Sequence, residues 1–239
     1  MSLSKRMLDL LATSIGLIVI LPMLLVISLL VRIFLGIPIL FRQQRPGYKG
    51  RPFTTYKFRT MTNRCGPDGR LLPDADRLTP FGRFLRSTSL DDLPQLLNVL
   101  RGEMSLVGPR PCLPYEYDKY LPWQKERFGT VPGLTGLWQV SGKNKTTFVE
   151  MIQLDIKYAK NKTLWWDLKI ILMTIPALII QMLETRQGKK MSPGPVRPKT
   201  NYSNRAIEQH SFTKATLVGA VHAADGEDVW IRKETKLNL

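Results

Sequence analysis

The chain has 239 residues, of which 35 are Lys or Arg and 19 are Asp or Glu, so its formal net charge is +16 and its pI is near 10.1. This length suits one ordinary domain with accessory segments and argues against two large cores. The basic balance favours polyanionic partners: nucleic acid, anionic lipid or phosphorylated substrates. Cys65 and Cys112 have neither zinc-site nor disulfide-framework spacing. Both histidines lie near the C-terminus, so earlier acid–base chemistry must rely on carboxylates, Lys, Tyr or Cys.

Residues 10–31 form an uncharged apolar run of 22 residues. A continuous helix of that length is ~33 Å long, enough to cross a bilayer. Basic residues flank the run on both sides, and positive flanks prefer the cytoplasm. Pro22, in the middle, lacks an N–H and disfavours an unbroken helix. We therefore expect a re-entrant helix-break-helix in the membrane over residues 1–34, with a kinked spanning helix as the alternative.

Residues 37–60 predict short strands separated by Pro-Gly and Lys-Gly turns, with aromatic and basic side chains interleaved. Such a surface suits stacking on single-stranded nucleic acid, or equally a membrane-interface rim that binds phosphates. Residues 62–77 are polar, contain Gly and Pro, and predict a loop.

The stretch TSLDDLPQLLNVLRGEMSLVGPRP, residues 88–111, combines paired acids with an apolar period. Leucines recurring from Leu90 to Leu100 predict a one-faced helix. Ser89 fits its N-cap, and Asp92 fits the reciprocal capping position three residues later.

Asp91 and Asp92 have two interpretations. Acids in a first helical turn commonly just complement the helix dipole. With Arg86 and Arg110 nearby, however, the cations would keep an aspartate ionised well below neutral pH, ready for nucleophilic attack or for binding Mg²⁺. Fixed arginines also bind phosphate oxygens, so the combination indicates phosphoryl transfer. A P-loop is not present in the sequence, and Cys112, a rival nucleophile without an activating histidine, is expected to pack.

Residues 164–183 predict an apolar helix that is either interfacial or part of a core. Its uncharged part, residues 170–183, is short for a span, and the paired Trp165 and Trp166 favour the membrane interface. The composition then changes to a Pro/Gly/Lys-rich linker. Residues 186–239 are expected to be this linker and a tail, which is either disordered or a β-hairpin about Asp225-Gly226.

Four stretches together resemble the bacterial sugar transferase family of monotopic phosphoglycosyl transferases. They are FRQQRPGYKGRPFTTYKFRTM, LTPFGRFLRSTSLDDLPQLLNVLRGEMSLVGPRP, VPGLTGLWQVSGKN and LDIKYAKNKTLWWDLKIILMT. The resemblance covers roughly residues 5–183. It implies an α+β fold: a re-entrant membrane hairpin over residues 1–34 that breaks at Pro22, then a small mixed catalytic domain over residues 35–185 with several amphipathic interfacial helices.

The resemblance also implies the reaction: transfer of a phospho-sugar from a UDP-sugar to undecaprenyl phosphate with Mg²⁺, releasing UMP. Asp91 matches the nucleophile that forms an aspartyl phospho-sugar intermediate, and Asp92 its catalytic and metal-binding partner. The residues expected to hold phosphates are Lys57, Arg59, Arg86 and Arg110. The implied location is the cytoplasmic face of the bacterial inner membrane, in one leaflet, with a homodimer possible and nucleic acid not a partner.

Two positions depart from the family pattern. The family usually has Asp-Glu where this chain has Asp91-Asp92, so the second acidic side chain is one methylene shorter here, and it often has a serine where Leu21 precedes the proline. The motifs GLWQVSGK and LWWDL resemble members that transfer a hexose-1-phosphate such as glucose or galactose.

Two other functions fit the same residues. A membrane-anchored protein could bind lipid or nucleic acid through its charge alone. A metal phosphohydrolase could use the same acids with water as the acceptor.

Overall fold

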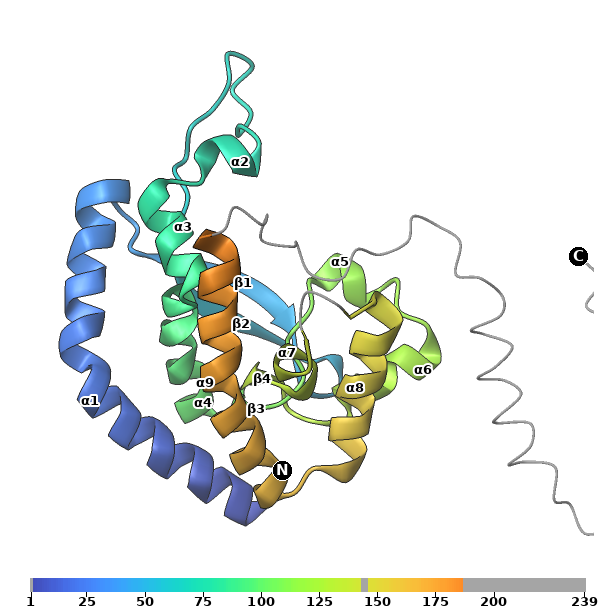
Figure 1. Cartoon of the computed structure of the whole chain (residues 1–239). Coiled ribbons are helices and arrows are strands. Elements are labelled where there is room, and N and C mark those ends of the chain that lie inside the picture. The colour runs from blue at the N-terminus through green and yellow to red at the C-terminus, as the bar shows by residue number, and fades with distance from the viewer. Residues whose placement is uncertain (1, 143–145, 187–239) are drawn as a thin grey trace, which may run out of the picture. The chain divides into compact units, whose positions relative to one another are not determined.

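The computed structural model describes residues 2–142 and 146–186, which form a mixed assembly of helices around two small sheets (Figure 1). The linker and tail predicted for residues 186–239 lie outside the described residues from residue 187 on. The α-helices are α1 (Leu3–Leu35), α2 (Asp74–Arg77), α3 (Pro80–Ser87), α4 (Leu96–Arg101), α5 (Pro114–Tyr117), α6 (Pro122–Lys125), α7 (Leu137–Val140), α8 (Phe148–Asn161) and α9 (Leu164–Arg186). The strands and 3₁₀ helices are β1 (Leu40–Pro46), β2 (Pro52–Phe58), β3 (Ser105–Val107), β4 (Gly133–Thr135), η1 (Tyr48–Gly50), η2 (Leu90–Gln95) and η3 (Glu126–Gly129).

Helix α1 runs without interruption through Pro22. The prediction of a helix-break-helix is therefore wrong as secondary structure. An interior proline removes one hydrogen bond and crowds the preceding turn, which bends a helix without ending it when the other bonds persist. Figure 1 shows α1 bending part-way along its length. Its ends are defined by Ser2, whose Oγ accepts from the Lys5 N–H, and by Gly36 at φ 76°.

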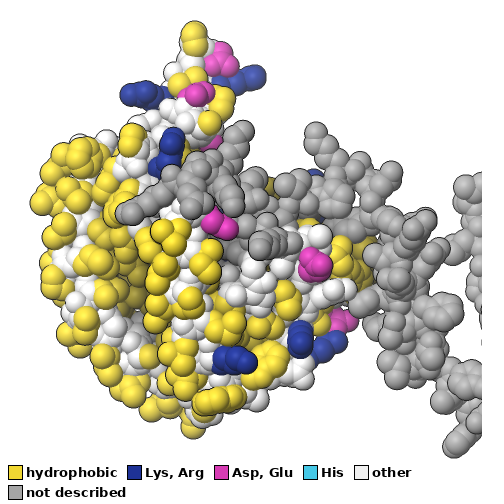
Figure 2. Space-filling view, in the orientation of Figure 1, with side chains coloured by type: hydrophobic (Ala, Val, Ile, Leu, Met, Phe, Trp, Pro, Cys, Tyr) yellow, Lys and Arg dark blue, Asp and Glu magenta, His cyan; other side chains and the backbone are white. Residues whose placement is uncertain are grey.

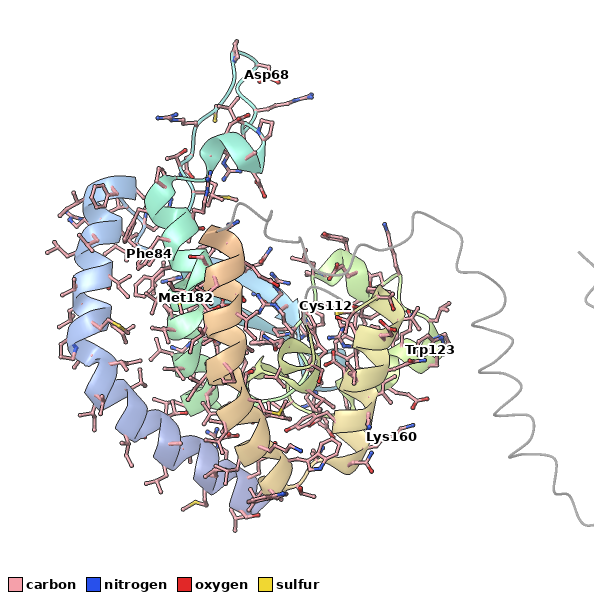
Figure 3. The ribbon with its side chains drawn as sticks, viewed as in Figure 1. Asp68, Phe84, Cys112, Trp123, Lys160 and Met182 are labelled. Carbon is pink, nitrogen blue, oxygen red and sulfur yellow. The ribbon has the colours of Figure 1, made fainter. Side chains whose placement is uncertain are left out.

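The predicted strands in residues 37–60 are confirmed as an antiparallel hairpin. β1 and β2 pair in register from Leu40 opposite Phe58 to Pro46 opposite Pro52. Gly50, at φ 78°, allows the tight reversal between them. The predicted loop over residues 62–77 is also present, with α2 at its end, and Figure 3 shows Asp68 at its protruding tip.

The single helix predicted from Leu90 is instead two elements, the 3₁₀ helix η2 and the α-helix α4. Pro94 lies inside η2, where it cannot donate an intrahelical hydrogen bond. Ser89 is left-handed at φ 57° and its side chain caps nothing, so the predicted capping pair with Asp92 is wrong. The leucine period did not mark the buried face: Leu96 is buried but Leu97 is 41% exposed, and Asn98 and Val99 are the fully buried positions of α4. Nor could it distinguish the two helix types.

Helix α3 precedes this segment and lies directly against the chain at Thr60. Thr79 caps α3 by accepting from the Gly82 N–H at 2.9 Å. A Cβ at Gly82 would lie 1.9 Å from the Thr60 carbonyl oxygen, so only glycine fits. The close approach fixes α3, and with it the start of η2, against the end of β2.

Strands β3 and β4 form a short parallel pair, Ser105 opposite Gly133 and Val107 opposite Thr135. Their backbones lie so close that a Cβ at Gly133 would be 2.0 Å from the Gly108 N. Val107 packs with Tyr158 of α8 and Ile170 of α9 in one core cluster.

Helices α1 and α9 carry most of the exposed large apolar side chains of the described residues (Figure 2). Both are long and apolar enough to cross a membrane by length and composition. Trp165 is 71% exposed and Ile175 60% exposed, so α9 is not the helix of a soluble core. This exposure supports the interfacial interpretation of residues 164–183 and indicates membrane association.

Both ends of α1 are attached to the same body of the protein. Near its start, Lys5 Nζ lies 2.6 Å from Asp167 Oδ2 and donates to the Tyr158 hydroxyl at 3.2 Å, while Asp9 Oδ1 accepts from the Leu106 N–H at 3.1 Å. At the other end a second core cluster joins the helix to β2 and α3. Its buried members are Ile27, Val31, Leu35, Phe58 and Leu85.

We expect Lys5→Met to lower the free energy of unfolding by about 3–5 kcal/mol, because it leaves Asp167 charged and buried without its cation. Thermal unfolding in detergent measures the change. Lys160→Met is the matched control: its ion pair with Glu126 is exposed, and its loss should cost at most about 1 kcal/mol. Equal small effects of the two substitutions would contradict the prediction.

Candidate functional site

Asp91 and Asp92 begin η2, immediately after the left-handed Ser89. The Asp91 side chain is turned inward, and the residue is 9% exposed. Within the described part of the chain its carboxylate takes part in no hydrogen bond or ion pair. A buried acid without a partner is costly to the fold, which is a common property of a reacting group.

The Asp92 carboxylate, by contrast, is surrounded by donors. Its Oδ1 lies 2.5 Å from Lys57 Nζ and accepts from Gln95 Nε2 at 2.6 Å, and its Oδ2 lies 3.5 Å from Arg110. Lys57 comes from β2 and Arg110 from the loop after β3, so three separate elements meet here. The charge of Asp92 is thereby largely neutralised.

Arg86 and Arg110 are both held in place by the fold. Arg86 Nε donates to Thr60 Oγ1 at 3.0 Å, across the close contact between α3 and the end of β2. The Arg110 carbonyl accepts from the buried Arg127 at 2.9 Å, and Arg127 is itself paired with Asp155. Of the predicted phosphate-binding residues, Lys57, Arg86 and Arg110 thus lie around the acid pair.

Arg59, also predicted to bind phosphate, is placed differently. Its guanidinium is buried and donates to the carbonyls of Met61 at 3.0 Å and Ile37 at 2.9 Å. In this arrangement it braces the start of the loop beyond β2. Phosphate binding by Arg59 stays a prediction, and no contact among the described residues brings it to Asp91.

The pKa of the Asp91 carboxyl is raised from 3.8 to about 6. Burial is the largest cause and the adjacent charge of Asp92 the second, while Lys57, Arg110 and Arg86 act to lower the pKa. The expectation that cations would keep this group ionised well below neutral pH is therefore wrong. The sequence showed the cations but not the burial, and burial is the larger effect. At neutral pH the carboxyl is still mainly ionised.

Cys112 packs in the interior, as Figure 3 shows, and is 6% exposed. Burial raises the pKa of its thiol to about 11. The expectation that Cys112 packs is confirmed, and a thiol this weakly acidic is a poor nucleophile at neutral pH.

A cavity of about 620 Å³, called here the α9 cavity, lies between α9 and the body of the protein. Asp92 and Arg110 are part of its lining, so it adjoins the acid pair. Its apolar lining comes from Leu90, Leu93, Leu106, Leu134, Val140, Ile171, Ile175, Ala177, Leu178 and Ile180.

Several residues that shape this site are not predicted from the sequence. Gln181 of α9 donates to the carbonyls of Arg86 and Ser87 at 3.2 and 3.1 Å, which holds the turn into η2. Gln139 lines the α9 cavity, and its buried Oε1 has no partner among the described residues. Gln95 carried the one local signal, because its spacing of three from Asp92 places the two side chains together in a 3₁₀ helix.

A family model described as bacterial sugar transferase matches residues 1–181. The chain belongs to the bacterial sugar transferase family. The resemblance drawn from the four sequence motifs is thus confirmed, and the acid pair with its three cations is the candidate active site of a sugar transferase.

Curated relatives support the membership. The uncharacterized sugar transferase EpsL of Bacillus subtilis is 46% identical over 150 residues, covering 63% of this chain and 74% of EpsL. The UDP-glucose:undecaprenyl-phosphate glucose-1-phosphate transferase of Caulobacter vibrioides is 45% identical over 189 residues, covering 74% of this chain and 70% of the relative. The galactosyl transferase CpsE of Streptococcus agalactiae is 41% identical over 199 residues, covering 74% of this chain but only 42% of CpsE.

We expect Asp91→Asn to raise the free energy of unfolding at pH 7.5, by at most about 3 kcal/mol for a pKa shift from 3.8 to about 6. The carboxyl ionises above about pH 4 in the unfolded chain and only above about pH 6 in the folded one. The stabilisation should therefore grow as the pH rises through this window and vanish below it. Thermal unfolding at several pH values measures the effect.

Asp92→Asn is the matched control and should have the opposite effect at pH 7.5. It leaves Lys57 and Arg110 facing each other without the carboxylate between them. An Asp91→Asn protein that unfolds earlier than the unaltered protein at pH 7.5 would contradict the assignment of Asp91 as the strained member of the pair.

Proposed function

We propose that the protein transfers a hexose-1-phosphate from a UDP-sugar to undecaprenyl phosphate and releases UMP, as a first membrane step of polysaccharide assembly. The observation that carries the proposal is Asp91, a buried carboxylate without a partner among the described residues, beside an Asp92 held by cations. Relatives named as glucose-1-phosphate and galactose phosphotransferases of undecaprenyl phosphate support the substrate class.

In the first half-reaction an Asp91 oxygen attacks the β-phosphorus of the UDP-sugar. A bond forms between that oxygen and phosphorus, the bond from phosphorus to the bridging oxygen breaks, and its electron pair leaves with UMP. Arg86 and Arg110 are placed to bind phosphate oxygens and to neutralise the charge that develops. Lys57 supplies a third positive charge through its contact with Asp92.

In the second half-reaction a phosphate oxygen of undecaprenyl phosphate attacks the phosphorus of the aspartyl phospho-sugar. A P–O–P bond forms, the bond to Asp91 breaks, and the electron pair returns to the carboxylate. The product is undecaprenyl diphosphate sugar, and Asp91 is regenerated. The burial that raises its pKa also keeps Asp91 poorly solvated, which favours attack over a resting hydrated state.

Mg²⁺ fits this arrangement as a bound cofactor. The ion is commonly held by one or two carboxylates together with substrate phosphates, and Asp91 and Asp92 supply those two carboxylates. Among the described residues no group of three or more His, Cys, Asp or Glu gathers to hold a metal, so substrate phosphates and water would supply the remaining oxygens. When bound, the ion would neutralise charge on the diphosphate.

We also propose that α1 enters and leaves one leaflet on the cytoplasmic face of the bacterial inner membrane. Support comes from its two attachments: Lys5 near the start and Leu35 at the end both pack on the body that carries the active site. A helix that crossed the bilayer would place these two ends on opposite sides. Basic residues at both ends agree with a cytoplasmic location.

Intact-protein mass spectrometry tests the reaction. After incubation with Mg²⁺ and UDP-glucose or UDP-galactose, we expect the unaltered protein to gain the mass of one phospho-hexose and Asp91→Asn to gain none. Transfer to undecaprenyl phosphate should fall by at least about 10³-fold in Asp91→Asn, because the attacking group is gone.

Asp68→Asn, at the exposed tip of the loop, is the control and should keep both activities. An adduct that persists in Asp91→Asn would place the nucleophile elsewhere. Many turnovers of UMP release without undecaprenyl phosphate would indicate a phosphohydrolase.

Labelling with a membrane-impermeant maleimide tests the topology. The exposed native Cys65 reports the side of the catalytic body, and Ser4→Cys adds a thiol at the exposed start of α1. In intact spheroplasts we expect neither thiol to react, and after lysis both. Labelling at position 4 alone in intact spheroplasts would show that α1 spans the membrane.

A further inference from the structure

The α9 cavity is open on the apolar side of the molecule. Ile175 and Ile180 line it and are also 60% and 56% exposed, so its mouth lies on the exposed face of α9. That face continues along α9 through Leu172, Ile179 and Leu183, which are about half exposed or more. If α9 lies at the membrane, the cavity opens toward lipid.

The walls of the cavity offer hydrocarbon rather than free polar groups. Thr174 donates to the Ile170 carbonyl at 2.7 Å and its hydroxyl lies 2.8 Å from that of Thr135, so both are satisfied within the protein. The Gln181 amide is engaged by the end of α3. Gln139 Oε1 is an exception that a water or a ligand hydroxyl could satisfy.

The same cavity includes charged groups of the active site. Asp92 and Arg110 line it, and Arg110 remains 37% exposed at its side chain. Glu184 also lines it, on α9. A single hollow thus joins a lipid-facing mouth to a cation that is placed to bind phosphate.

We propose that the α9 cavity binds the prenyl chain of the acceptor next to its phosphate, so that the phosphate reaches Arg110 and Asp91. This inference rests on the proposed function. A phosphate attached to a hydrocarbon chain matches both parts of the lining, because the chain is removed from water along apolar side chains and the phosphate meets a guanidinium. A UDP-sugar is polar throughout and gains little from these walls.

Filling the cavity should therefore impair the second half-reaction and leave the first intact. Ala177 is a small, half-buried residue of the lining. We expect Ala177→Phe to raise the KM for undecaprenyl phosphate at least tenfold while the rate of adduct formation with UDP-glucose or UDP-galactose stays within twofold. Normal adduct formation also shows that the variant is folded.

Leu172→Phe is the matched control, since it adds the same ring to the exposed face of α9 outside the cavity lining. An unchanged KM in Ala177→Phe, or an equal rise in Leu172→Phe, would overturn the proposal. Failure of the unaltered protein to form any adduct would instead refute the proposed function, so the two failures can be distinguished.

Photo-crosslinking of the unaltered protein gives a second measurement that does not depend on a variant. A prenyl phosphate that carries a diazirine in its first isoprene units should label peptides containing residues 90–93 or 171–180. Labelling confined to α1 would overturn the proposal. So would native mass spectrometry showing a phospholipid in the cavity that undecaprenyl phosphate does not displace.

Discussion

A single ammonium group, Lys5 Nζ, connects the elements on which the rest of the structure depends. It contacts Asp167 of α9, the Tyr158 hydroxyl of α8 and the Val107 carbonyl of β3. Removing a lysine and an aspartate from water is costly, and here a hydroxyl and a carbonyl add hydrogen bonds that offset the cost. Because α1 and α9 carry most of the exposed large apolar side chains and β3 leads into the Arg110 loop, this contact fixes the apolar side of the protein relative to the candidate active site.

The two neighbouring acids, Asp91 and Asp92, differ in their contacts with the rest of the protein. The Asp92 carboxylate forms ion pairs with Lys57 and Arg110 and accepts a hydrogen bond from the Gln95 amide. These contacts hold β2, η2 and the Arg110 loop together. Asp91 receives no such contact from the described residues, and for this reason we propose it as the nucleophile. At the position of Asp92, where the family usually has glutamate, the shorter aspartate is long enough for these contacts, because its Oδ1 lies 2.5 Å from Lys57 Nζ.

Local signals in the sequence were enough for the elements that depend on local chemistry. The turn residues predicted the β1–β2 hairpin, the apolar run with paired tryptophans predicted the apolar helix α9, and the positions of Arg86 and Arg110 on either side of the acid pair predicted that these charges lie together. The left-handed Ser89 could not be predicted, because it is imposed by how α3 ends and by the Gln181 amide from a distant helix. The burial of Asp91 is likewise a property of packing, which the acids and arginines in the sequence do not reveal.

At Pro22 the local rule that proline breaks a helix gave a wrong prediction, because α1 continues through this residue. A proline does weaken one turn, yet α1 has attachments at both ends that keep the two halves in one continuous helix. The sequence pattern did not distinguish one bent helix from two helices separated by a break at Pro22.

The contact between Lys5 and Asp167 also has a consequence for the order of folding. The two residues are 162 positions apart, so the ribosome releases the whole of α1 long before the partner of Lys5 exists. The contact between Lys5 and Asp167 can therefore form only late in synthesis, after most of the described residues have been made. A nascent chain that ends before Asp167 would contain the whole of α1 but lack the ion pair that holds the start of this helix.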